Sequence, residues 1–114
     1  MNVSNKRRAS LIHELLVNIV NDTIKNEQIG YINIVDVDLS NDLSFCKVFF
    51  TILNDKEELI NTTLRILEDN KKEIRIKLAN EIKHIKKIPE LIFKYDESLT
   101  YSKKIDKLLN NIIK

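Results

Sequence analysis

Two strand-like segments on either side of a helical block most constrain the fold of this chain. Residues 45–53 form a nearly continuous apolar run, interrupted by Lys47 and Thr51, and residues 91–95 alternate between the two faces of a strand. Both patterns are typical of β-strands with a buried face. The residues between them have apolar side chains at helical spacing. The chain must therefore combine helices with a small sheet in an α+β fold.

The residues before the first of these strands predict a helix followed by a hairpin. Apolar side chains at three- and four-residue spacing predict a helix over residues 10–25. Residues 31–39 are rich in β-branched side chains and predict a strand, in which the apolar phase changes midway. Either both faces of its first half are covered or a bulge switches the phase. The short turn at residues 40–42 makes an antiparallel hairpin the natural pairing. Gly30, the only glycine, predicts a backbone position that needs a positive φ or a close approach.

The helical block divides into two helices. Asp55 is the predicted N-cap of the first, and residues 69–72 interrupt it. The second runs over residues 73–85, and Pro89 ends the helical region. An amphipathic helix follows from Tyr101. The predicted order is α-β-β-α-α-β with a C-terminal helix, the helices packing on a three-stranded sheet.

Size and composition indicate a single domain without catalytic or metal chemistry. A chain of 114 residues is near the common domain size, so residues 1–114 are expected to form one domain with residues 100–114 as a helical extension. The lone cysteine, Cys46, lies in an apolar run and is predicted to be a core residue. His13 and His84 lie in no recognisable motif, and no cofactor or small-molecule substrate is expected. We therefore expect a protein that is not an enzyme.

The N-terminal residues indicate a cytoplasmic protein. They are short, polar and basic, and no apolar segment with a small-residue cleavage site follows. The first predicted helix carries His13, Glu14, Asn18 and Asp22, which a signal peptide or a membrane span would not tolerate.

The net charge of +2 conceals an uneven distribution. Residues 1–70 hold 7 Lys and Arg against 11 Asp and Glu, and residues 71–114 hold 12 against 6. Three basic groups stand out, namely Lys6, Arg7 and Arg8, then Lys71, Lys72, Arg75 and Lys77, and then Lys83, Lys86 and Lys87. Such groups can neutralise nucleic-acid phosphates. On charge alone, a solvated helix surface is the stronger interpretation.

The order of elements resembles the type II KH domain, an RNA-binding fold. The GxxG loop of KH domains is missing, because the helix junction holds Asn70, Lys71 and Lys72. The chain more closely resembles the ribosome-binding factor A family, a KH-like family in which a helix kink, commonly Ala-x-Gly, replaces that loop. The family glycine aligns with Lys72, and Asn70 can take the left-handed conformation that a kink there would need.

Several motifs carry this resemblance. Residues 24–30, IKNEQIG, are similar to the family segment IKDPRLG, and residues 40–49, SNDLSFCKVF, to its S-x-DL-x-x-AKVY signature. Ile74 and Arg75 match an Ile-Arg pair. Residues 86–98, KKIPELIFKYDES, are similar to the closing R-x-x-PEL-x-F-x-x-D-x-S. The similarity spans nearly the whole chain.

The resemblance implies a non-catalytic assembly factor that acts as a monomer. It would bind the free small (30S) ribosomal subunit and assist 16S rRNA 5′-end processing and late subunit maturation, with a role in cold adaptation. The side chains expected to contact rRNA phosphates are Arg7, Arg8, Lys47, Lys71, Lys72, Arg75 and Lys86. Two alternatives stay open: a generic single-stranded RNA-binding KH-like module, and a protein–protein adaptor acting through the C-terminal helix.

Overall fold

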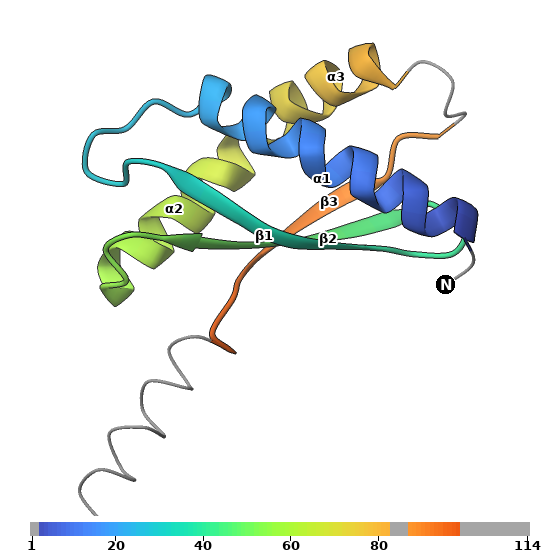
Figure 1. The fold of residues 1–114 in the computed structure, drawn as a ribbon. Coiled ribbons are helices and arrows are strands. Elements are labelled where there is room, and N and C mark those ends of the chain that lie inside the picture. The colour runs from blue at the N-terminus through green and yellow to red at the C-terminus, as the bar shows by residue number, and fades with distance from the viewer. Residues whose placement is uncertain (1–2, 83–86, 99–114) are drawn as a thin grey trace, which may run out of the picture.

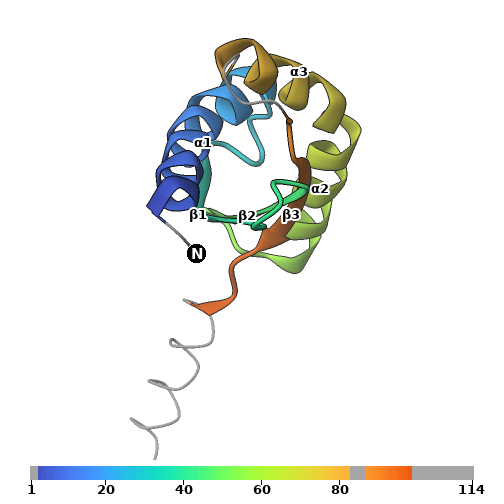
Figure 2. The same cartoon turned by 90° about the vertical axis from the view of Figure 1, so that its right-hand side faces the viewer.

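The computed structural model describes residues 3–82 and 87–98, and in this part of the chain three helices cover one face of a three-stranded sheet (Figures 1 and 2). The elements are α1 (Val3–Thr23), β1 (Ile32–Leu39), β2 (Phe45–Ile52), α2 (Glu57–Asp69), α3 (Lys71–Glu81) and β3 (Glu90–Tyr95). The predicted α+β fold and its order α-β-β-α-α-β are confirmed. The predicted helix from Tyr101, and with it the extension at residues 100–114, lies outside the described residues.

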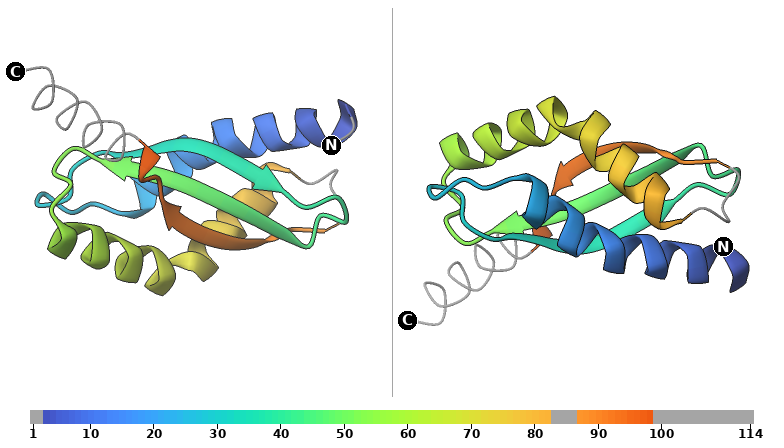
Figure 3. Two further views of the ribbon diagram at one scale, coloured as in Figure 1. Left: turned by 90° about the horizontal axis from the view of Figure 1, so that it is seen from below. Right: turned by 90° about the horizontal axis from the view of Figure 1, so that it is seen from above.

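The sheet joins a hairpin to a strand from much later in the chain. Its order is β1-β2-β3, with β1 antiparallel to β2, as the short turn predicts, and β3 parallel to β2. In the register, Val48 of β2 lies between Val37 of β1 and Phe93 of β3. A parallel neighbour needs a long crossover connection, which α2 and α3 provide (Figure 3).

A bulge in β1 explains the change of apolar phase in its sequence. The register against β2 shifts between Ile34 and Asp36. Before the shift Ile32 and Ile34 are buried, and after it Val37 and Leu39 are buried. The extra residue therefore lets both halves of β1 direct apolar side chains at the helices.

The core lies between the sheet and the helix layer. Its fully buried members come from every layer and include Leu16 of α1, Phe50 of β2, Leu67 of α2 and Leu78 of α3. Cys46 is also buried, as predicted, and burial raises the pKa of its thiol to about 12. The thiol is therefore protonated and unreactive at neutral pH.

Polar side chains fix α1 against β1. The Asn21 amide Nδ2 donates to the Ile32 carbonyl oxygen over 2.8 Å, and the Asn21 Oδ1 accepts from the Ile32 amide over 2.8 Å. His13 Nε2 lies 2.7 Å from the Ile34 carbonyl oxygen. Gly30 has a φ of 69°, as its position predicts. The loop between α1 and β1 is therefore held firmly where it enters the sheet.

Asn70 alone separates α2 from α3. Its φ of −104° and ψ of 5° place it outside the left-handed region. The left-handed conformation that the sequence allowed for a kink at Asn70 is therefore not adopted. The Asn70 Nδ2 donates to the Ile66 carbonyl oxygen over 2.8 Å, and the Asn70 carbonyl accepts from the Ile74 amide over 3.0 Å. The helix interruption thus forms without glycine, because Asn70 satisfies backbone groups on both sides of it.

The helix boundaries differ from those predicted. The helix α1 begins at Val3 rather than residue 10, and α3 runs from Lys71 to Glu81. The predicted N-cap Asp55 is wrong, since Lys56 is the N-cap of α2 and makes no side-chain capping bond. Instead the Asn54 Oδ1 accepts from the Lys56 amide over 3.3 Å. Helix ends depend on local competition for a few hydrogen bonds, which apolar periodicity does not reveal.

Candidate nucleic-acid interface

The first turns of α1 present exposed basic side chains. Arg7 and Arg8 are exposed, and Lys6, Arg7, Ser10, Leu11 and Glu14 line a shallow depression of about 360 Å³. The Arg8 Nη1 donates to Asn5 Oδ1 over 3.2 Å, and the Asn5 Nδ2 donates to the Asn41 carbonyl oxygen over 3.4 Å. These contacts hold the start of α1 beside the β1–β2 hairpin.

The same hairpin also receives the segment that leads into β3 (Figure 3). The Lys87 Nζ donates to Ser44 Oγ over 2.9 Å, and the Glu90 amide donates to the Ser44 carbonyl over 2.9 Å. Asp42 lies in the hairpin, and a bond from the Ser44 amide, with others from Ser40 and Ser44, lowers the pKa of its carboxyl. Tertiary structure therefore places Lys87 at the end of the molecule where α1 begins. The predicted contact set omits Lys87, because its place beside α1 depends on the sheet pairing.

Of the two lysines at the helix junction, one is exposed and has no ion-pair partner among the described residues. The Lys71 Nζ lies 2.9 Å from a carboxylate oxygen of Glu68, and the Lys71 side chain is 21% exposed. Lys72 is exposed and forms no ion pair within the described part of the chain. It borders a depression of about 290 Å³, lined also by Arg75, Ile76, Ala79 and Ile88. Lys72 is therefore the junction residue whose charge is most available to a ligand.

Arg75 connects α3 to the residues that precede β3. Its Nε donates to the Pro89 carbonyl over 3.2 Å, and its Nη2 donates to the Ile88 carbonyl over 3.1 Å. The side chain is half-buried. The guanidinium therefore stabilises the crossover connection, whatever it contacts outside the protein.

We expect Arg75→Ala to lower the free energy of unfolding by about 1–3 kcal/mol, because two backbone carbonyls lose a charged donor. Arg75→Lys should lose less, since one ammonium can still reach one carbonyl. Urea denaturation followed by circular dichroism measures both. Arg65→Ala, at an exposed position of α2, is the control and should change stability by less than about 0.5 kcal/mol. Equal stability of the Arg75→Ala and Arg65→Ala variants would contradict the structural role.

Lys47 lies on the other side of the sheet. It is exposed, whereas its neighbours Cys46 and Val48 are buried against the helices. Its cross-strand partners are Asp38 and Ile92. Since side chains alternate along a strand, Lys47 points away from the helix layer. The structure therefore does not bring Lys47 together with Lys71, Lys72 and Arg75.

The predicted contacts thus divide into separate groups. Arg7 and Arg8 on α1 and Lys72 on α3 are exposed, and both helices belong to the layer that covers the sheet (Figure 2). Lys86 lies outside the described residues. Exposed cations of this kind can neutralise phosphates in a salt-dependent way.

Within residues 3–82 and 87–98, no group of three or more His, Cys, Asp or Glu side chains could hold a metal ion. No helix in this described part is long and apolar enough to cross a membrane.

Comparison with known proteins gives the family. The family model for ribosome-binding factor A matches residues 4–109. The chain belongs to the ribosome-binding factor A family. A ribosome-binding factor A of Phytoplasma mali (strain AT) is 46% identical over 114 residues, which is all of both chains. The resemblance seen in the sequence motifs is therefore confirmed.

Solved structures share the fold of this family member. A Thermotoga maritima protein, studied by NMR in solution, has a TM-score of 0.69 and 22% identity, covering 86% of this chain and 93% of its own. A homology model of Thermus thermophilus ribosome-binding factor A, fitted into a cryo-EM map of a 30S complex, has a TM-score of 0.68 and 18% identity. It covers 79% of this chain and 92% of its own. Both support the arrangement of helices on a three-stranded sheet.

Proposed function

We propose that this chain is a non-catalytic assembly factor that binds the free small (30S) ribosomal subunit in the cytoplasm. It assists 16S rRNA 5′-end processing and late subunit maturation, and it has a role in cold adaptation. The observation that carries this proposal is membership of the ribosome-binding factor A family over residues 4–109. A Thermus thermophilus member with the same fold has been fitted into the map of a 30S complex.

The helix layer is the proposed rRNA-binding side. Arg7, Arg8 and Lys72 have exposed charges there, and each can neutralise a phosphate and release its counterion. Lys71 and Arg75 stabilise the structure of this surface, because their charged groups already bind Glu68 and backbone carbonyls, respectively. Lys47 would contact RNA only if the rRNA also extends to the side of the sheet opposite the helices. Lys86 stays a predicted contact outside the described residues.

Sucrose-gradient sedimentation of a cell lysate tests the proposal. The protein is expected in the fractions of free small subunits and not in those of complete ribosomes. Raising the salt concentration should release it, because the contacts are mainly to phosphates. A protein that stays at the top of the gradient at low salt would exclude subunit binding.

The same experiment separates the alternatives. A generic single-stranded RNA-binding module would bind short free RNA tightly and show no preference for small subunits. A protein–protein adaptor would depend on the C-terminal segment, which lies outside the described residues. Deleting residues 100–114 should leave subunit binding intact if that segment serves a different partner.

A further inference from the structure

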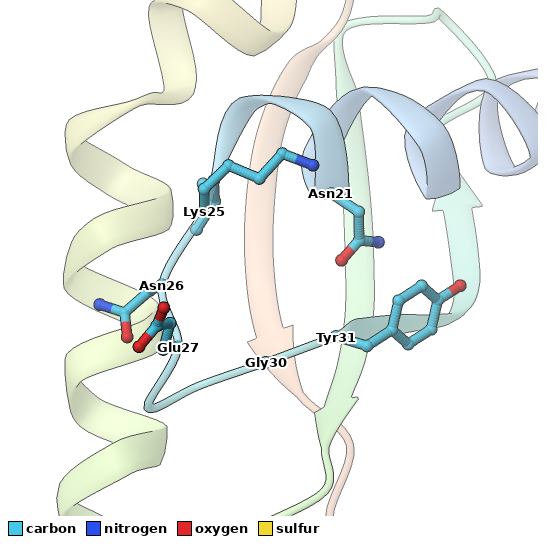
Figure 4. A pocket seen from close by; sticks show the side chains of 7 residues that line it. Asn21, Lys25, Asn26, Glu27, Gly30 and Tyr31 are labelled. Carbon is cyan, nitrogen blue, oxygen red and sulfur yellow. The ribbon is translucent and has the colours of Figure 1, made fainter.

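The loop between α1 and β1 borders an open pocket. None of the residues that line this pocket is among the predicted RNA contacts. Its volume is about 440 Å³, within the range of small-molecule sites (Figure 4). The lining residues are Asn21, Ile24, Lys25, Asn26, Glu27, Gly30 and Tyr31. They come from the end of α1, the turn that follows it and the residue before β1. All of the lining residues therefore belong to one stretch of chain, residues 21–31.

Hydrogen bonds fix the shape of this pocket. The Asn26 Oδ1 accepts from the amides of Gln28, over 2.9 Å, and Ile29, over 3.3 Å. The Gly30 amide donates to the Asn26 carbonyl over 2.8 Å, and its φ of 69° turns the chain toward β1. Asn21 joins the end of α1 to the start of β1. Because the backbone is already held, a ligand would pay little to order it.

The side chains at the rim are an aromatic ring and opposite charges. Tyr31 is 58% exposed, and Lys25 and Glu27 are also exposed. In Figure 4 the Lys25 side chain extends along the end of α1 toward Asn21, Tyr31 lies on the opposite edge, and Asn26 and Glu27 lie at the turn. None of the polar tips of Lys25, Glu27 and Tyr31 has a hydrogen-bond or ion-pair partner among the described residues. These groups are available to a ligand.

We propose that this pocket binds one unstacked nucleotide, with its base against the Tyr31 ring and its phosphate near the Lys25 ammonium. Aromatic side chains are common stacking platforms for unpaired bases. Asn26 and Glu27 lie at the turn, on the other side of the pocket from Tyr31, and complete its polar rim. The inference rests on the proposed function, because an unpaired rRNA residue is the occupant that function would supply.

The local charge decides which part of the nucleotide contributes most. Lys25 and Glu27 offset each other, so the pocket has no net charge to attract a phosphate. The base should therefore provide most of the affinity, and binding here should depend only weakly on salt. The cations of the helix layer, in contrast, predict strong salt dependence.

Amide chemical shifts recorded on the full chain during titration with AMP test the inference. Residues 24–31 should shift saturably with AMP, and ribose 5-phosphate, which lacks the base, should leave them nearly unchanged. Tyr31→Ala should weaken AMP binding by roughly 5- to 100-fold, the loss typical of one stacked base. Tyr31→Phe keeps the ring and should bind like the original chain. Equal shifts with ribose 5-phosphate, or no effect of Tyr31→Ala, would overturn the inference.

A single-stranded tetraadenylate distinguishes the two sources of such a nucleotide. If the tetraadenylate binds more tightly than AMP, the occupant is an RNA residue. If the two bind equally well, the occupant is a free nucleotide. The result is also independent of the gradient experiment. Sedimentation with small subunits but no AMP shifts would overturn the pocket alone. AMP shifts without subunit binding would overturn the proposed function alone.

Discussion

Reversing the charges of Arg7, Arg8 and Lys72 to Glu in one variant is expected to weaken binding to small subunits by roughly 100-fold or more at low salt. Each lost phosphate contact removes about 0.9 from the slope of log affinity against log salt concentration, so three contacts remove roughly 2 to 3. All three side chains are exposed, so the overall fold should be retained, although Arg8→Glu also removes the hydrogen bond to Asn5 Oδ1. Co-sedimentation with purified small subunits at several salt concentrations measures both the affinity and the slope.

A control variant with the same change in charge shows whether the position of the charge matters. Lys56, Arg65 and Lys94 are exposed and lie outside the proposed contact set, so their reversal to Glu should reduce binding much less. A single Lys47→Glu variant tests the opposite side of the sheet. If the control triple variant loses as much affinity as the Arg7, Arg8 and Lys72 variant, the interface is not on the proposed part of the helix layer.

Phe50→Ala is expected to lower the free energy of unfolding by about 3–5 kcal/mol. Phe50 is 0% exposed on the central strand β2, and its ring meets that of Tyr95 edge-on at a centroid distance of 5.7 Å. Truncation removes this buried contact area and leaves a cavity between sheet and helices. Since whole domains are stable by only about 5–15 kcal/mol, the loss is a large part of the total. Urea denaturation followed by far-UV circular dichroism measures it.

Phe45→Ala is the matched control on the same strand. Phe45 is 49% exposed and points away from the helices, so its truncation should cost less than about 1 kcal/mol. If both variants lost the same stability, the sheet would not be packed with Phe50 toward the helix layer.

Most of the secondary structure follows from local patterns in the sequence. Alternation in residues 91–95 and the apolar run in residues 45–53 predicted β3 and β2 correctly. The phase change in residues 31–39 left two interpretations open, a half-strand covered on both faces or a bulge, and the register shows the bulge. Asp55 was wrongly predicted to cap α2, because a carboxylate at the correct spacing can cap only if the backbone turns toward it.

The candidate interface could be predicted only in part. The sequence identified Arg75 as basic, but only the structure shows that Pro89 and Ile88 hold its guanidinium. The pocket beside Tyr31 was missed, because its walls form when Asn21 joins α1 to β1. The available signal in the sequence was a tyrosine directly after the sole glycine.

By itself, the sequence determined the family, the order of elements and the residues that form the core, because apolar periodicity and short motifs are local properties of the chain. Only the tertiary structure decided which cations share a side of the molecule. Strand alternation directs Lys47 away from the helices, and the crossover through α2 and α3 brings Lys87 to the hairpin beside α1. Charges that are grouped along the chain are therefore separated in space, since each side chain follows the face of the element that carries it.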